Sequence, residues 1–133
     1  MEIPPVIRWS MAAAGIFQLG VGLGMFYFPT AFLAIWPWTL TPLTARVIGR
    51  WFSLPGAGGL MIAAEKRWSA VRITLQGTLI HVGLLLIGVW RAWTDFDLTK
   101  PLTRAYLGML LVSFFGIGAL YFWMEHRRSA SAK

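Results

Sequence analysis

Residues 101–124 read PLTRAYLGMLLVSFFGIGALYFWM, a continuous apolar stretch in which Arg104 is the only charged side chain. An α-helix rises about 1.5 Å per residue, so roughly 20 apolar residues are needed to cross a hydrocarbon core about 30 Å thick. This stretch is long enough to cross, and three other runs have the same character. They lie at about residues 9–28, 42–64 and 70–92.

The whole chain, residues 1–133, is therefore predicted to be one all-α domain, an integral membrane four-helix bundle. Residues 30–36 (TAFLAIW) are too short to cross and are expected to form an interfacial helix that ends at a Trp-Pro-Trp turn. Residues 125–133 are expected to form a basic, frayed tail.

The composition supports lipid as the solvent. Apolar residues make up 57% of the chain and charged residues only 13%, which is too few to cover the surface of a small soluble domain. The chain has 12 Lys and Arg residues and 5 acidic residues. Most of the basic residues stand at the ends of the apolar runs, where they meet lipid headgroups. We therefore expect the lipid bilayer as a partner and no nucleic acid. The absence of cysteine excludes disulfides and thiolate metal sites.

The distribution of positive charge predicts the orientation. Four spans place the two termini and the loop at Glu65 on one side of the membrane, together with the larger group of Lys and Arg residues. We therefore expect a multi-pass protein of the cell membrane with both termini in the cytoplasm. The larger group is Arg8, Lys66, Arg67, Arg72, Arg127, Arg128 and Lys133; the opposite side holds Arg46, Arg50, Arg91, Lys100 and Arg104.

The second span has a clear beginning and an irregular interior. Thr41 is expected to cap it and Pro42 to occupy its first position, while Pro55 is expected to kink it. Arg46 and Arg50 are four residues apart and share a face near the outer end. Three interpretations remain open for this pair: snorkelling to the headgroups, binding an anionic lipid or ligand, or an ion-pair clamp with Asp95 and Asp97.

One polar residue stands near the middle of each predicted span. These residues, expected to face inward and meet in one layer, are Gln18, Ser53, His81 and Ser113. Gly77 lies one turn before His81 and leaves room for a flat macrocycle beside the imidazole. One hypothesis is therefore a binding site at His81 for haem or chlorophyll, or for a quinone or lipid. The alternative is that His81 only hydrogen-bonds within the layer and sets the helix register. No metal site is predicted.

Glycines are expected to allow close helix packing. Gly20 and Gly24 form a GxxxG pair in the first span, and Gly116 and Gly118 form a small patch in the fourth. Either set could pack within the bundle or against another protein.

The stretch from Phe28 to Gly59, FPTAFLAIWPWTLTPLTARVIGRWFSLPGAGG, resembles small four-helix bacterial membrane proteins of uncharacterised function, through its WPW turn followed by LTPLTAR. The resemblance implies a location in the cell inner membrane and no particular activity. The plan of four spans, with a Phe-Pro end to the first and a short interfacial piece after it, is also similar to the DoxX-like family. That similarity is one of architecture and identifies no functional residue.

The span interiors hold few groups that can perform chemistry, so we expect no enzyme and no catalytic residue. The preferred hypothesis is a non-catalytic accessory or structural subunit that packs against a larger membrane complex. The alternative is a bundle that binds a small ligand at His81.

Overall fold

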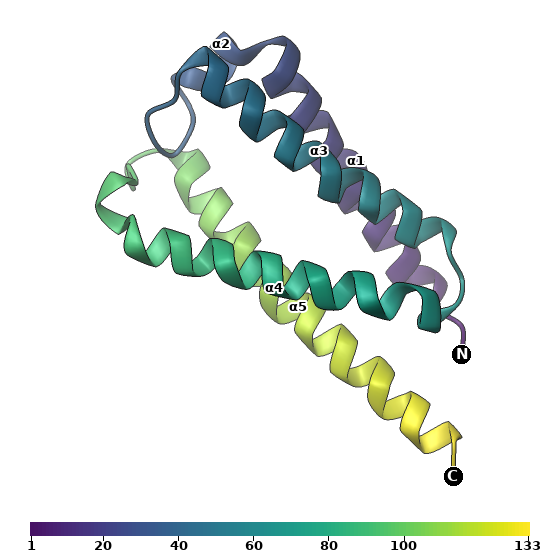
Figure 1. Cartoon of the computed structure of the whole chain (residues 1–133). Helices are drawn as coiled ribbons and strands as arrows, with labels where there is room; N and C mark the ends of the chain where they lie inside the picture. Colours follow the sequence, from purple (N-terminus) through teal and green to yellow (C-terminus); the bar gives the residue numbers. More distant parts are fainter. The chain divides into compact units, whose positions relative to one another are not determined.

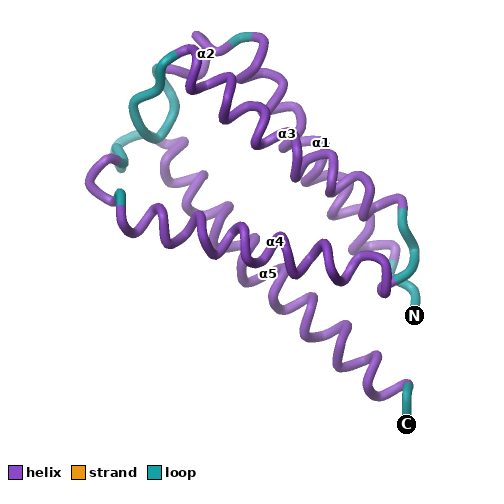
Figure 2. Tube along the Cα trace, in the orientation of Figure 1, coloured by secondary structure: helices purple, strands orange, loops and turns teal.

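The computed structural model describes all residues, 1–133, and consists of helices joined by loops, with no strand (Figures 1 and 2). This confirms the all-α class. There are five α-helices and one short 3-10 turn: α1 (Pro5–Tyr27), α2 (Pro29–Leu33), α3 (Pro42–Ala64), α4 (Trp68–Arg91), η1 (Trp93–Asp95) and α5 (Pro101–Ser131). The chain divides into two compact units at Lys66 and Arg67. We call them the first hairpin (residues 2–66, α1 to α3) and the second hairpin (residues 67–133, α4 to α5).

Three helices, α1, α4 and α5, are long and apolar enough to cross a membrane. Helix α3 has 23 residues, about 35 Å of helix, and so has the length. It differs from the others in its polarity, because Arg46 and Arg50 lie in its first half and Pro55 in its interior. Three of the four expected spans are therefore candidates to cross a membrane by length and composition.

Several helix boundaries differ from expectation for local reasons. Helix α1 begins at Pro5, which stands in the first turn, where its missing N–H costs nothing. The short helix between the first two long ones is α2, which begins one residue earlier than expected and ends sooner. Helix α4 takes Arg67 rather than Ser69 as its N-cap residue.

Helix α5 continues through the tail that we expected to fray. It reaches Ser131, and its last turns are held by short-range bonds. The hydroxyls of Ser129 and Ser131 each donate to the carbonyl four residues earlier, and Arg128 lies 3.4 Å from the Glu125 carboxylate. The tail is therefore a helical extension of the last long helix.

Glycines allow α1 and α3 to touch backbone to backbone in the first hairpin. A Cβ added to Gly22 would lie 2.6 Å from the Gly49 carbonyl oxygen, and one added to Gly15 would lie 2.7 Å from the Gly56 carbonyl oxygen. Only glycine fits at such distances, which also permit Cα–H···O contacts between the helices. We call these four residues, Gly15, Gly22, Gly49 and Gly56, the glycine seam.

The seam uses other glycines than the GxxxG pair of Gly20 and Gly24. Gly20 has no atom within 4 Å of an added Cβ, and Gly24 faces only the ring of Phe32. In α5, Gly116 is equally open, and Gly118 approaches only Leu79 at 3.9 Å. The expected motif is therefore largely free of helix contacts, and glycines seven positions apart make the close ones.

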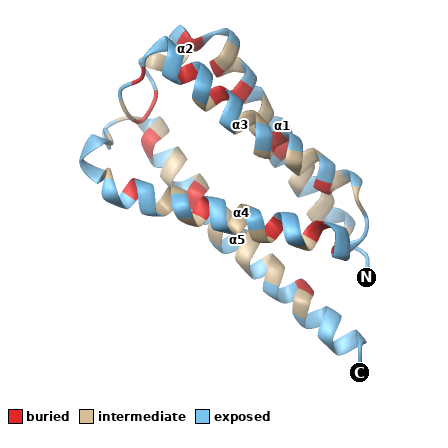
Figure 3. Cartoon of the chain, in the orientation of Figure 1, coloured by how far each residue is buried: buried red, intermediate tan, exposed pale blue.

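Side chains rather than backbone separate α4 and α5. Their core contains Val82, Val89 and Leu110, with partly buried apolar side chains around it. Thr103 is fully buried beside the loop and donates to the Asp97 carbonyl at 2.6 Å. Figure 3 shows the buried residues of each hairpin along the facing sides of its helices, with the outer faces exposed. The exposed faces are mostly apolar.

The two hairpins share a pattern of residues. Arg-Trp-Ser occurs at residues 8–10 and 67–69, in or next to the first turns of α1 and α4, and Pro-Leu-Thr opens α3 and α5 at residues 42–44 and 101–103. The interval between the two motifs is the same in both hairpins. A third pattern, Ser-x-x-Gly-x-Gly-x-Leu, recurs at residues 53–60 and 113–120. Its two copies are one residue farther apart than the copies of the other two motifs. The second hairpin therefore repeats the first in both sequence order and helix order.

The repeat also shows why the two hairpins pack differently. When the two copies of Arg-Trp-Ser are aligned, Thr74 and His81 of α4 correspond to Gly15 and Gly22 of α1. A side chain at the Gly22 position cannot come within 3 Å of a facing carbonyl without displacing it. Helices α4 and α5 therefore cannot form the seam of the first hairpin.

Candidate functional site

The first turns of α3 present two arginines on one face. Thr41 caps the helix by accepting a bond from the Thr44 backbone N–H at 3.2 Å, and Pro42 occupies its first position. This start matches the sequence prediction. Since Arg46 and Arg50 are one helical turn apart, both side chains leave α3 on the same side, and both are exposed.

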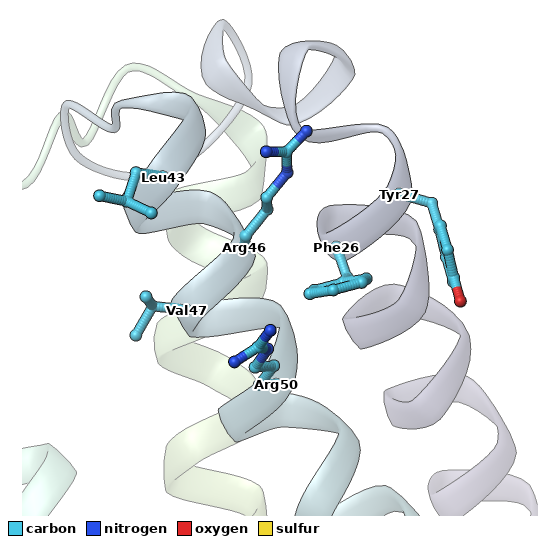
Figure 4. Close-up of a pocket in the computed structure, with 6 residues that line it drawn as sticks. All are labelled: Phe26, Tyr27, Leu43, Arg46, Val47 and Arg50. Atoms are coloured by element: carbon cyan, nitrogen blue, oxygen red, sulfur yellow. The ribbon is translucent and has the colours of Figure 1, made fainter.

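The arginines line a pocket of about 410 Å³ in the first hairpin (Figure 4). Its other lining residues come from the end of α1 and the start of α3, and most of them are apolar. Figure 4 shows the Arg46 and Arg50 side chains extending from α3 on the side toward which Phe26 projects from α1. The lining residues are Phe26, Tyr27, Leu43, Arg46, Val47 and Arg50.

An aromatic ring orders one of the two guanidinium groups. The Arg50 Cζ lies 5.0 Å from the centroid of the Phe26 ring, within the range of a cation–π interaction. Within the first hairpin, Arg46 has no hydrogen bond or ion pair, and Arg50 has no carboxylate partner. The pocket thus combines two uncompensated positive charges with an apolar wall, an arrangement that favours an amphipathic anion.

The sequence prediction included Arg46 and Arg50 but missed Phe26 and Tyr27. A signal was present, because these aromatics end the first long helix immediately before Phe28-Pro29, and α3 is the next long helix along the chain. When successive long helices pack antiparallel, the end of the first lies beside the start of the second. Which aromatic faces the arginines depends on how α1 is rotated about its axis, and local sequence does not specify that rotation.

The ion-pair clamp with Asp95 and Asp97 would join the first hairpin to the second, and it stays a prediction. Within its own loop, the Asp97 carboxylate accepts bonds from the hydroxyl and the backbone N–H of Thr99. These bonds, the hydroxyl one first, hold the pKa of Asp97 below its ordinary value, and the nearby Lys100 charge acts in the same direction. Within the first hairpin the arginines form no ion pair, which leaves them available to a ligand.

The four midspan residues do not form hydrogen bonds with one another within either hairpin. In the first, Ser53 donates to the Gly49 carbonyl at 2.8 Å, beside the glycine seam, and Gln18 is half-buried. In the second, Ser113 is half-buried and His81 is exposed on α4. Gly77, one turn from His81, has no atom within 4 Å of an added Cβ.

The structure reveals a polar cluster that the sequence reasoning missed. At the beginning of α4, the buried Trp68 donates its indole N–H to Glu125 of α5 at 2.9 Å, and Arg72 lies 3.7 Å from the same carboxylate oxygen. One turn further along, Gln76 donates to the Tyr121 hydroxyl at 2.6 Å. The signal was the set Trp68, Arg72 and Gln76, which at spacings of four share one helix face.

No group of three or more His, Asp or Glu side chains is close enough to hold a metal ion. Comparison with known proteins found no matching family model, curated protein or solved structure.

Proposed function

We propose that this chain is a non-catalytic integral membrane protein that acts as an accessory or structural subunit of a larger membrane complex. The observation that carries the proposal is the apolar, glycine-containing outer surface of both hairpins. Gly20, Gly77, Gly88, Gly108 and Gly116 have no atom within 4 Å of an added Cβ, and large apolar side chains beside them are exposed. Such faces allow close approach of another transmembrane helix.

The repeat supports α3 as a fourth membrane span. We infer that the two hairpins arose by duplication of one helix pair, because both the motifs and their spacing recur. Helix α5 is apolar enough to cross a membrane, and α3 is its counterpart with the same Pro-Leu-Thr start. On this basis four helices cross and both termini lie on one side, which the excess of Lys and Arg there makes the cytoplasmic side.

Purification in a mild detergent, followed by mass spectrometry of intact assemblies, tests the subunit proposal. We expect the chain to be recovered in defined stoichiometry with at least one larger membrane protein. Replacement of Gly116 or Gly108 by Leu is expected to reduce that recovery, and the matched change Ser129→Leu in the tail is expected to leave it unchanged. A chain recovered alone, with no co-purifying membrane protein, contradicts the proposal.

A second candidate function is binding of a small ligand at His81, favoured by the exposed imidazole beside the open Gly77. The polar atoms of the imidazole have no partner in the structure, and the first hairpin has glycine at the corresponding position. An absorption spectrum of the purified protein tests for haem or chlorophyll, and solvent extraction tests for a quinone or lipid. Bound material that is unchanged in His81→Leu rules out this site.

A further inference from the structure

The pocket at Arg46 and Arg50 holds positive charge that the first hairpin does not neutralise. The acids of this hairpin are Glu2 and Glu65, and both belong to its opposite end, where Ile3 N–H donates to the Lys66 carbonyl. Glu65 lies about 22 Å along the α3 axis from Arg50. At physiological salt the screening length is about 8 Å, so little attraction remains.

The second hairpin shows that the arginines are not needed to build a helix pair of this kind. In the repeat alignment Ala105 and Met109 of α5 correspond to Arg46 and Arg50 of α3. The second hairpin therefore forms without a pair of positive charges at these positions. A charged side chain at the centre of a membrane span costs about 2.5–3.5 kcal/mol, and the cost falls toward the ends of the span. Arg50, two turns into α3, bears part of this cost unless an interaction compensates it.

The arginines of α3 lie near enough to the helix start for their side chains to reach the headgroup region. Arg46 and Arg50 lie about 6 Å and 12 Å along the axis from the helix start at Pro42. Their long side chains can reach toward the membrane surface, and the positive end of the helix dipole lies on the same side. An anion at this level meets both guanidinium groups and the helix start.

We propose that this pocket binds the phosphate group of an anionic membrane lipid. The proposal rests on the proposed function, in which α1 and α3 both span the membrane. Two guanidinium groups suit a phosphate because each can donate two parallel hydrogen bonds to its oxygens. The Phe26 ring holds one of them in place. The apolar side chains of Leu43 and Val47 line the same pocket and offer a surface for the acyl portion of a lipid, which inorganic phosphate lacks.

Native mass spectrometry of the full-length protein, delipidated in detergent and titrated with phosphatidylglycerol, tests the site. We expect one high-affinity lipid in the wild type and binding roughly 10-fold to 100-fold weaker in Arg46→Gln/Arg50→Gln, because two charge-assisted contacts are removed. The matched control, Arg91→Gln/Lys133→Gln, removes the same charge from exposed positions outside the pocket and is expected to bind as the wild type does. Equal binding by the two double variants overturns the proposal.

A conservative variant keeps the test valid if the glutamine variant does not fold. Arg46→Lys/Arg50→Lys retains both charges but loses the paired donors, and it is expected to bind severalfold more weakly than the wild type. Wild-type affinity in this variant contradicts recognition by paired guanidinium donors. Displacement of the lipid by millimolar inorganic phosphate assigns the pocket to a free anion and overturns the lipid assignment.

Membrane integration is measured separately, by extraction of membranes with alkaline carbonate. A protein released by carbonate refutes the proposed crossing itself. A protein that stays in the membrane but shows no preference for phosphatidylglycerol over phosphatidylcholine refutes only the lipid site.

Discussion

The glycine seam leads to a quantitative prediction for Gly22→Ala. The added methyl group would lie 2.6 Å from the Gly49 carbonyl oxygen and 2.5 Å from the Ser53 Oγ, whereas ordinary contacts begin near 3.4 Å. Ser53 can rotate away, but the carbonyl belongs to the backbone of α3. The helices must therefore separate locally by about 0.8 Å, the difference between 3.4 and 2.6 Å.

The energetic cost follows from that separation. Overpacking of a fitted contact costs about 1–3 kcal/mol, and a gap of about 0.5–1 Å along the rest of the seam forfeits a quarter to a half of the dispersion energy there. Alanine recovers up to about 1 kcal/mol through its higher helix propensity. We expect the free energy of unfolding to fall by about 2 kcal/mol.

Gly20→Ala is the matched control, two residues away on the same helix. Nothing lies within 4 Å of its added methyl group, so only the propensity gain applies, and we expect a change between zero and about 1 kcal/mol of stabilisation. Reversible unfolding of the detergent-solubilised protein in sodium dodecyl sulfate, followed by tryptophan fluorescence, measures both variants. Equal stabilities for Gly22→Ala and Gly20→Ala would refute the backbone-to-backbone seam.

Three further predictions concern polar contacts. Because the pKa of Asp97 is lowered, its bonds to Thr99 stabilise the loop at pH values above the unfolded pKa, about 3.9, and this stabilisation is lost as pH falls through the lower folded pKa. An NMR titration of the Asp97 carboxyl carbon should have its midpoint below about 3.9, and a midpoint at or above that value contradicts the assignment. Arg8→Leu removes a 2.8 Å bond from the guanidinium to a carbonyl at the end of α3 and should lower the free energy of unfolding by about 1–2 kcal/mol, with Ser10→Ala as a near-neutral control. A double-mutant cycle of Gln76→Leu and Tyr121→Phe should give a coupling of about 0.6 kcal/mol, and a coupling of zero means that the bond adds nothing to stability.

Features that depend on near neighbours in the chain were accessible from the sequence. The length of the apolar runs indicated long helices, and Thr41 with Pro42 predicted the start of α3 because capping involves groups only a few residues apart. The shared face of Arg46 and Arg50 follows from helical geometry alone. These predictions hold whatever the helices pack against.

The partners of each helix face were decided by tertiary structure. The sequence contains several glycines in α1, but only Gly15 and Gly22 meet α3, while Gly20 faces open space. Phe26 meets Arg50, and Trp68 meets Glu125, across distances in sequence that no local rule connects. Each contact depends on the rotation of a helix about its own axis, and that rotation is set by the summed packing of the whole helix pair. Residues close together in the sequence therefore determine where the helices start and how long they are. The seam, the pocket and the polar cluster form only when the helices of each hairpin pack together.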